Sequence, residues 1–227
     1  MISTTAISPI LTIPPLENGD KLTRHEFERR YHAMPNLKKA ELIEGVVYVA
    51  SPVRAKQHGK PHARIMGWLI AYEAATPGVE ALDNTTVLLD TDNEPQPDAL
   101  LRIETGGQSR INKDDYVEGA PELIVEIAAS SASYDLHEKL KVYRRNQVQE
   151  YLIWRVYDYQ FDWFRLQQGE YIQLQHNADN IICSQIFPGL WLDKIALLGG
   201  DLGTVLAVLQ QGLASPEHEN FISRLSS

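Results

Sequence analysis

The sequence predicts a single α/β domain with additions at both ends. The chain has 227 residues, long enough for one sizeable core, and 44% of them are apolar, as in soluble globular proteins. Helical and strand-like hydrophobic patterns alternate along it, with no repeat or low-complexity tract. Residues 123–128 (LIVEIA) are the most apolar short segment, as expected of a central strand.

The N-terminal end combines an irregular segment with a short helix. Residues 1–20 are rich in Thr, Pro and Ser without any period, which predicts a flexible N-terminal arm. Thr23 and Glu26 form a capping box, so a helix is expected to begin there and to end before Pro35.

A hairpin and a longer helix are expected next. Residues 40–50 alternate in hydrophobicity and predict two strands joined by a turn at Glu44 and Gly45. Residues 58–75 carry apolar side chains at helical spacing, and the Thr-Pro-Gly at 76–78 is expected to end that helix.

The middle of the chain supplies most of the predicted sheet. Strand patterns cover 84–90 and 97–103, and 105–118 is predicted to be a polar loop. The apolar strand at 123–128 follows it. Residues 135–146 then place apolar side chains on one helical face.

The C-terminal third begins with strands and ends in a helix. A strand is expected at 149–156 and a hairpin at 161–175. Residues 190–213 end in a helix whose apolar face needs a partner. We therefore expect one domain at 21–195 and a C-terminal helical extension at 196–227.

Charge and cysteine content limit the function classes. The net charge of −9 argues against a surface that is basic throughout, although a local basic strip could still contact phosphates. A single cysteine, Cys183, fits a reducing cytoplasm. No apolar run approaches the ~20 residues that cross a bilayer, and no signal peptide is recognisable, so a cytoplasmic location without membrane contact is expected.

Two acidic residues interrupt strands that are otherwise apolar. Asp98 shares a strand face with Leu100, and Glu126 shares one with Ile124. A charged carboxylate in such a place is costly unless it is paired or binds a metal, and hard cations such as Mg²⁺ prefer carboxylate oxygens. The alternatives are that Glu126 is exposed or paired with an arginine, and that Asp98 belongs to a Pro-Asp turn.

A lysine follows on the next predicted helix. Phosphodiester cleavage needs a cation near the attacking water or the developing charge, and Lys139 could supply it. The alternative is a solvated helix charge paired with Asp135, four residues earlier. Lys139, Lys141, Arg144 and Arg145 form the densest basic cluster, which is either a phosphate-contacting strip or a solvated helix face.

Short motifs spread over most of the chain resemble a known family. The motifs are ELIEG at 41–45, SP at 51–52 followed by His58, PD at 97–98, PEL at 121–123 leading to VEI at 125–127, Asp135 followed by Lys139 and Tyr143, and EYLIW at 150–154. Their order resembles the Uma-two group of restriction endonucleases, within the PD-(D/E)xK superfamily, over about residues 20–195. The resemblance implies a restriction-endonuclease-like fold, with helices flanking a central mixed β-sheet.

The resemblance also implies an activity and a set of site residues. It implies an endonuclease that hydrolyses the phosphodiester bonds of nucleic acid, with DNA as the expected partner and Mg²⁺ or Mn²⁺ as the cofactor. Asp98 and Glu126 would be catalytic metal ligands, with Glu41 as a third acid whose alternative is a strand-edge carboxylate. Lys139 would be the catalytic lysine, because Ala128 stands where the superfamily pattern has lysine. A two-fold homodimer would suit cleavage of both strands of a duplex.

Weaker features leave alternatives open. His58 is an auxiliary candidate, although His62 fits the pattern equally and a surface histidine is the plain alternative. The serine-rich segment at 129–133 lacks a proline that the resemblance leads us to expect. A catalytically silent binding or regulatory module is the main alternative function, favoured by the net charge and by Ala128. A structural protein that dimerises through its C-terminal helix is another.

Other catalytic classes have no motif here. The chain contains no Gly-rich phosphate loop, no GxSxG nucleophile motif and no HExxH zinc motif, and one cysteine cannot form a cysteine zinc site.

Overall fold

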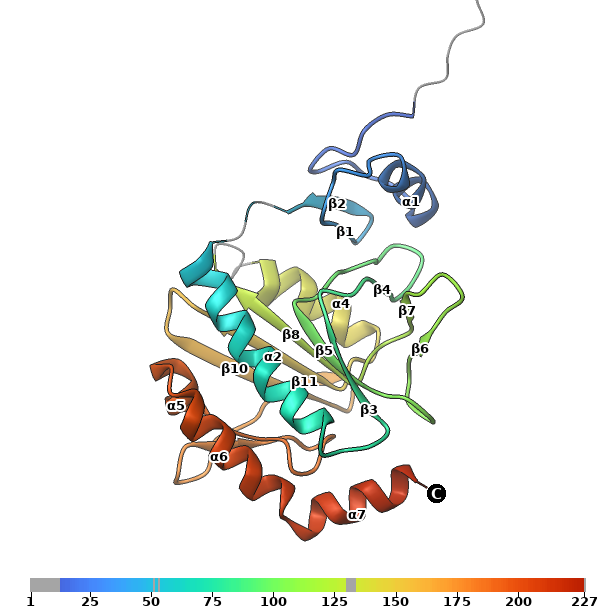
Figure 1. The fold of residues 1–227 in the computed structure, drawn as a ribbon. Coiled ribbons are helices and arrows are strands. Elements are labelled where there is room, and N and C mark those ends of the chain that lie inside the picture. The colour runs from blue at the N-terminus through green and yellow to red at the C-terminus, as the bar shows by residue number, and fades with distance from the viewer. Residues whose placement is uncertain (1–12, 51, 53, 130–133, 227) are drawn as a thin grey trace, which may run out of the picture.

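A six-stranded mixed sheet forms the centre of the protein (Figure 1). The computed structural model describes residues 13–50, 52, 54–129 and 134–226, with only the backbone at Asp135. The strand order is β11-β10-β9-β8-β5-β3. In sequence order these strands are β3 (Val79–Asp83), β5 (Ala99–Ile103), β8 (Leu123–Ala128), β9 (Glu150–Arg155), β10 (Gln160–Gln167) and β11 (Glu170–Gln173). Only β8 and β9 are parallel among these neighbours, which confirms the predicted mixed sheet.

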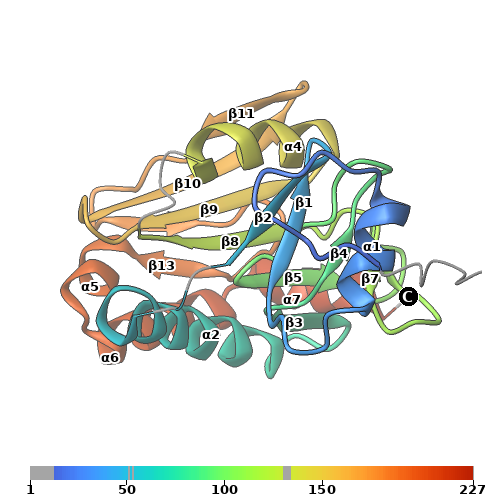
Figure 2. The ribbon, with the colours of Figure 1, turned by 90° about the horizontal axis from the view of Figure 1, so that it is seen from above.

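Helices cover both faces of this sheet (Figure 2). On one face lie α2 (Lys60–Glu73), α5 (Lys194–Gly199), α6 (Leu202–Leu213) and α7 (Pro216–Leu225), and on the other lies α4 (Leu140–Arg145). Trp68 of α2 belongs to the same core as Val125, whereas Tyr143 of α4 packs in a second core with Ile124. Alternate residues of β8 therefore face different layers, as its period of two predicts.

A separate N-terminal layer packs beside the sheet. It contains α1 (Arg24–His32) and a hairpin of β1 (Ala40–Ile43) and β2 (Val46–Val49) around its own small core. The Thr23 hydroxyl accepts a hydrogen bond from the Glu26 N–H, which confirms the predicted helix start. Glu44 and Gly45 have φ values of 53° and 70°, the signature of the tight hairpin turn predicted there.

The predicted arm at 1–20 is described only from residue 13 onward. Leu16 is buried in the N-terminal core, and its N–H contacts the sulfur of Met34 at 3.1 Å. The predicted serine-rich turn at 129–133 falls almost wholly outside the described residues.

Several short strands differ from the sequence prediction. The segment predicted as a strand at 84–90 contains only β4 (Val87–Leu88), and the longer strand β3 lies just before it. The predicted loop at 105–118 contains β6 (Arg110–Ile111) and β7 (Val117–Glu118), which join β4 in a small sheet. A further pair, β12 (Ile181–Cys183) and β13 (Trp191–Asp193), was not predicted. Strands of two or three residues are too short to show a period.

The partner of the apolar C-terminal helix lies within the chain itself. Val205 and Leu209 of α6 are buried in the main core together with Ile65 of α2. Dimerisation through this face, one of the sequence-based alternatives, is therefore wrong, because the face is already covered. In the described part of the chain, no helix is both long and apolar enough to cross a membrane.

Candidate active site

Two buried acids and a buried lysine meet at one end of β8. The Lys139 ammonium lies 2.8 Å from Glu126 Oε1 and 2.9 Å from Glu41 Oε1. Glu126 and Lys139 are each only 3% exposed. We call Glu41, Glu126 and Lys139 the acid–lysine cluster. The alternative of a solvated helix charge is wrong for Lys139, because two carboxylates from distant strands enclose its ammonium group.

Two further groups fix the carboxylates of the acid–lysine cluster. The Tyr143 hydroxyl donates a hydrogen bond of 2.8 Å to Glu126 Oε1. The backbone N–H of Gln96 donates one of 2.7 Å to Glu41 Oε1. From the sequence, Tyr143 was named only within the family motif and had no role in the site; in the structure its phenol joins the site while its ring packs in the core. The signal was available, because Tyr143 lies four residues after Lys139 and so shares its helical face.

Asp98 forms a second group beside this cluster. Its Oδ1 atom lies 3.1 Å from Nε2 of His58 and 3.6 Å from the Lys39 ammonium, and its Oδ2 accepts a 2.7 Å hydrogen bond from the Ile127 N–H. Burial by itself would raise the pKa of Asp98, but His58, Lys39 and the Ile127 amide together hold that pKa well below its usual range. Asp98 therefore stays ionised although it is only 4% exposed.

The strand register places Asp98 opposite Glu126. In the antiparallel pair of β5 and β8, Ala99 lies opposite Val125 and Leu100 opposite Ile124. One step further along the same register, Asp98 falls opposite Glu126. Residues opposite each other in such a pair share a face, with Cβ atoms ~4.5–5.5 Å apart. The two strongest sequence candidates are therefore cross-strand neighbours.

Two π-helical turns carry His58 and Lys139. His58 lies in η1 (Ala55–Gly59), which leads into α2, and Lys139 ends η2 (Asp135–Lys139), which leads into α4. Turns of this kind occur frequently at functional sites and shift the phase of the helix that follows. His62 also reaches Asp98, with Nε2 2.8 Å from the Asp98 carbonyl oxygen and 2.9 Å from Asp83 Oδ1. Both histidines therefore meet the same residue, His58 at its carboxylate and His62 at its backbone.

The four residues of the predicted basic strip are all paired with acidic side chains. Lys139 is buried in the acid–lysine cluster. The other three residues form ion pairs: Lys141 with Glu138, Arg144 with Glu170, and Arg145 with Glu44 and Asp90. Lys139 therefore leaves the predicted strip, and the other three are paired cations at the surface, which fits the alternative of a solvated helix face.

The donor set suits a hard divalent cation. Glu41, Asp98 and Glu126 offer carboxylate oxygens, which Mg²⁺ and Mn²⁺ prefer. Within the described residues, no three acidic, histidine or cysteine side chains are grouped closely enough to enclose a metal ion. Lys139 stands between Glu41 and Glu126, and His58 and Lys39 stand at Asp98, so cations of the protein itself balance these carboxylates.

Comparison with known proteins identifies the family of this chain. The sequence pattern of the Uma2 family, described as "Putative restriction endonuclease", matches residues 25–196, more than half of the chain. The chain belongs to the Uma2 family. No curated protein matches it. A similar solved structure is the crystal structure of "a putative nuclease belonging to DUF820 from Anabaena variabilis ATCC 29413", 12% identical with a TM-score of 0.54, covering 80% of this chain and 97% of that chain. That similarity concerns the fold and confirms the restriction-endonuclease-like architecture predicted for this Uma2 protein.

Sequence reasoning missed two polar partners in this Uma2 protein, Lys39 and Gln96, and left the choice between His58 and His62 open. Lys39 lies two residues before Glu41, a spacing that puts both on one face of an extended segment. His62 lies four residues after His58, on the same helical side. Gln96 acts through its backbone N–H, and nothing in its side-chain type could have indicated that contact.

Proposed function

We propose that this protein is a metal-dependent endonuclease that hydrolyses phosphodiester bonds, with DNA as its substrate and Mg²⁺ or Mn²⁺ as its cofactor. The observation that carries the proposal is the buried ion pair of Glu126 with Lys139, together with buried Asp98, which the strand register puts opposite Glu126. Membership of a family described as restriction endonucleases supports the same activity. Duplex cleavage would call for a two-fold dimer, which we include in the proposal.

The metal ligands would be Asp98 and Glu126, with Glu41 as the third acid. A bound divalent cation would act as a Lewis acid toward the phosphate and lower the pKa of a bound water. Lys139 forms ion pairs with both Glu41 and Glu126, so its ammonium group lies where it can stabilise charge that develops on the phosphate oxygens. The Tyr143 hydroxyl keeps Glu126 Oε1 in one orientation.

Cleavage assays on double-stranded DNA, single-stranded DNA and RNA, with Mg²⁺, with Mn²⁺ and with chelator, test the proposal. We expect activity that needs a metal and falls at least about 100-fold in both Asp98→Ala and Glu126→Ala, the size of loss seen when one catalytic charge-stabilising group is removed. Asp114→Ala, an exposed acidic residue in the loop between β6 and β7, is the matched control and should leave the rate unchanged. Metal-dependent activity retained in both site variants would refute the assignment of ligands. Nucleic-acid binding with no cleavage under any of these conditions would instead identify a silent binding module.

A different set of cations is available to meet the phosphates. Arg54, Lys56 and Lys60 are exposed on either side of His58, and among the described residues none of them is held in an ion pair. We expect Arg54→Glu, Lys56→Glu and Lys60→Glu, combined, to weaken DNA binding and to reduce the slope of log affinity against log salt by about one per lost phosphate contact. Binding measured by fluorescence anisotropy at several salt concentrations checks this. Lys113→Glu, an equal charge change at an exposed position between β6 and β7, should alter both quantities far less.

A further inference from the structure

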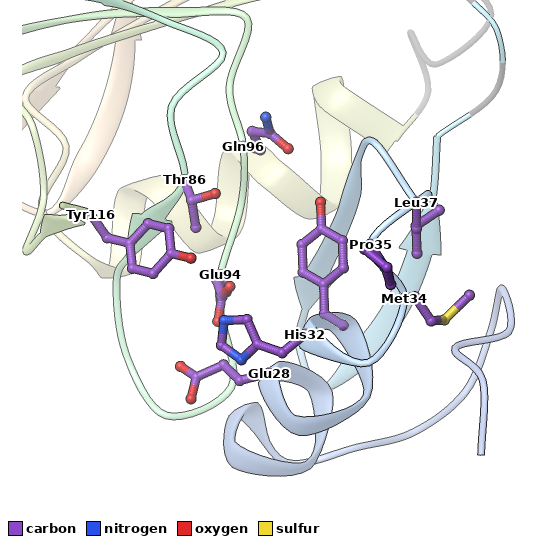
Figure 3. Close-up of a pocket in the computed structure, with 10 residues that line it drawn as sticks. Glu28, His32, Met34, Pro35, Leu37, Thr86, Glu94, Gln96 and Tyr116 are labelled. Atoms are coloured by element: carbon purple, nitrogen blue, oxygen red, sulfur yellow. The ribbon is translucent and has the colours of Figure 1, made fainter. Parts of the chain in front are cut away.

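A hollow lies beside the N-terminal layer. It has a volume of about 290 Å³ and lies between α1, the segment that follows α1, and the chain around Thr86, Glu94 and Gln96 (Figure 3). We call it the Glu94 cavity. Its volume is at the lower limit of ~300–1,000 Å³ typical of small-molecule sites, so it suits a compact ligand.

The Glu94 cavity contains hydrogen-bond acceptors that lack donors. Glu94 is only 5% exposed, and its Oε2 atom receives no hydrogen bond from a donor group among the described residues; its neighbour there is another acid, Glu28. Gln96 Oε1 is likewise buried without a partner in that part of the chain. Buried acceptors are almost always satisfied in native proteins, so two unsatisfied ones at one cavity point to a ligand that brings donors.

The charge of the cavity indicates what kind of donor is needed. Figure 3 shows the Glu28 and Glu94 carboxyl groups, the His32 ring and the Tyr116 hydroxyl turned toward the same space. Burial and then the nearby Glu28 carboxylate raise the pKa of Glu94 to about 8. Arg24 partly offsets this, but its guanidinium is engaged by Glu28 at 3.2 Å and by the Asp90 carbonyl oxygen. Above that pKa both acids are ionised, and a positive ligand would relieve the repulsion between them.

The walls of the cavity favour an organic cation over a metal ion. Tyr31, Met34, Pro35, Leu37 and Tyr116 contribute aromatic and apolar surface. Aromatic rings beside a carboxylate are a usual environment for ammonium and guanidinium groups.

We propose that the Glu94 cavity binds a small organic cation, an ammonium or guanidinium group on a short aliphatic chain. The cationic head donates hydrogen bonds to Glu94 Oε2 and Gln96 Oε1, and the aliphatic part lies against the apolar wall. The cavity also adjoins the candidate active site: Glu94 and Leu42 exchange backbone hydrogen bonds of 2.8 and 3.1 Å, and Leu42 follows Glu41. The Gln96 N–H in turn donates to Glu41 itself.

Isothermal titration calorimetry of the full chain at about pH 9, above the pKa of Glu94, with 1,4-diaminobutane and with methylguanidine tests the proposal and separates the ammonium from the guanidinium source. We expect at least one of these cations to bind, and 1,4-butanediol, a neutral molecule of similar shape to the diamine, not to bind. In Glu94→Gln the affinity should fall about tenfold or more, the loss expected for removal of one charged hydrogen-bond partner. Glu28→Gln, at the cavity rim, should cause a smaller loss in the same direction.

Glu217→Gln, an equal charge change on the exposed side of α7, is the control and should bind like the unaltered protein. Circular dichroism of each variant verifies that the fold is retained. The proposal is overturned if neither cation binds at millimolar concentration, if the diol binds as well as the diamine, or if Glu94→Gln leaves the affinity unchanged. None of these measurements depends on nuclease activity, so failure here and failure of the proposed function are distinguishable.

Discussion

Replacing Lys139 with methionine is expected to lower the free energy of unfolding by ~3–5 kcal/mol. The ammonium group lies within 2.9 Å of a carboxylate oxygen of both Glu41 and Glu126, and all three residues are buried. Methionine keeps most of the side-chain volume but leaves two buried carboxylates without their cation. Urea denaturation at pH 7 measures the loss, and the cleavage rate should fall in the same variant.

Lys141→Met provides the matched control two residues further along the same helical segment. Its ammonium pairs with Glu138 at the surface, with 63% and 45% of the two side chains exposed. A surface pair of this kind contributes ~0–1 kcal/mol, so this variant should be nearly as stable as the unaltered protein. Adding Glu41→Gln and Glu126→Gln to Lys139→Met should recover much of the stability, because the uncompensated charges are removed. Equal losses for Lys139→Met and Lys141→Met would contradict the buried ion pairs.

The sequence could predict which face of its strand an acidic residue occupies. The period of two in LIVEIA placed Glu126 on the face of Ile124, and the structure confirms it because the local geometry of a strand fixes that face. The same reasoning predicts that Asp98 shares the face of Leu100. Strand alternation thus assigned the correct face to Glu126 without knowledge of its neighbours.

Partners far apart in the chain could not be predicted in this way. Glu41 lies 98 residues before Lys139, and no periodic pattern connects them. The π turns at η1 and η2 change the helical phase, so regular spacing could not decide between His58 and His62. The pairing of Arg145 with Glu44 joins residues 101 apart, and for that reason a cluster that looked basic in sequence is neutralised in space.

The fold was predicted best where elements are long. The helix at 58–75, the strand at 123–128 and the hairpin at 161–175 correspond to α2, β8 and the β10–β11 pair. Strand β3 was missed because it begins directly after the predicted helix stop and alternates only weakly, with one buried residue out of five. Here pairing with β5 decides the structure, and a single sequence does not encode that pairing locally.

Glu94→Gln is expected to change how stability depends on pH. The pKa of this carboxyl is raised in the folded protein from 4.5 to about 8, by burial and then by the Glu28 carboxylate, with Arg24 opposing. A raised pKa means that the folded protein binds the proton more tightly than the unfolded chain does. Its stabilising contribution is therefore complete below pH 4.5 and is lost as the pH rises to about 8. Glutamine stands in for the protonated acid at every pH, so it does not lose this contribution.

The difference in unfolding free energy between the unaltered protein and Glu94→Gln reports on Glu94 alone, because the other titrating groups are the same in both. Glu150, fully enclosed in the core, also has a raised pKa of about 7, but it is present in both and cancels. Urea titrations at pH 4.5, 6, 8 and 9 measure the unfolding free energies of both proteins. The two values should be nearly equal at pH 4.5, and at pH 9 Glu94→Gln should be more stable by on the order of 3–5 kcal/mol. Parallel profiles would contradict the raised pKa. An organic cation bound in the Glu94 cavity would stabilise the unaltered protein with Glu94 ionised, but not Glu94→Gln, because glutamine offers the cation no counter-charge. It would therefore reduce the difference in unfolding free energy between the two proteins at high pH.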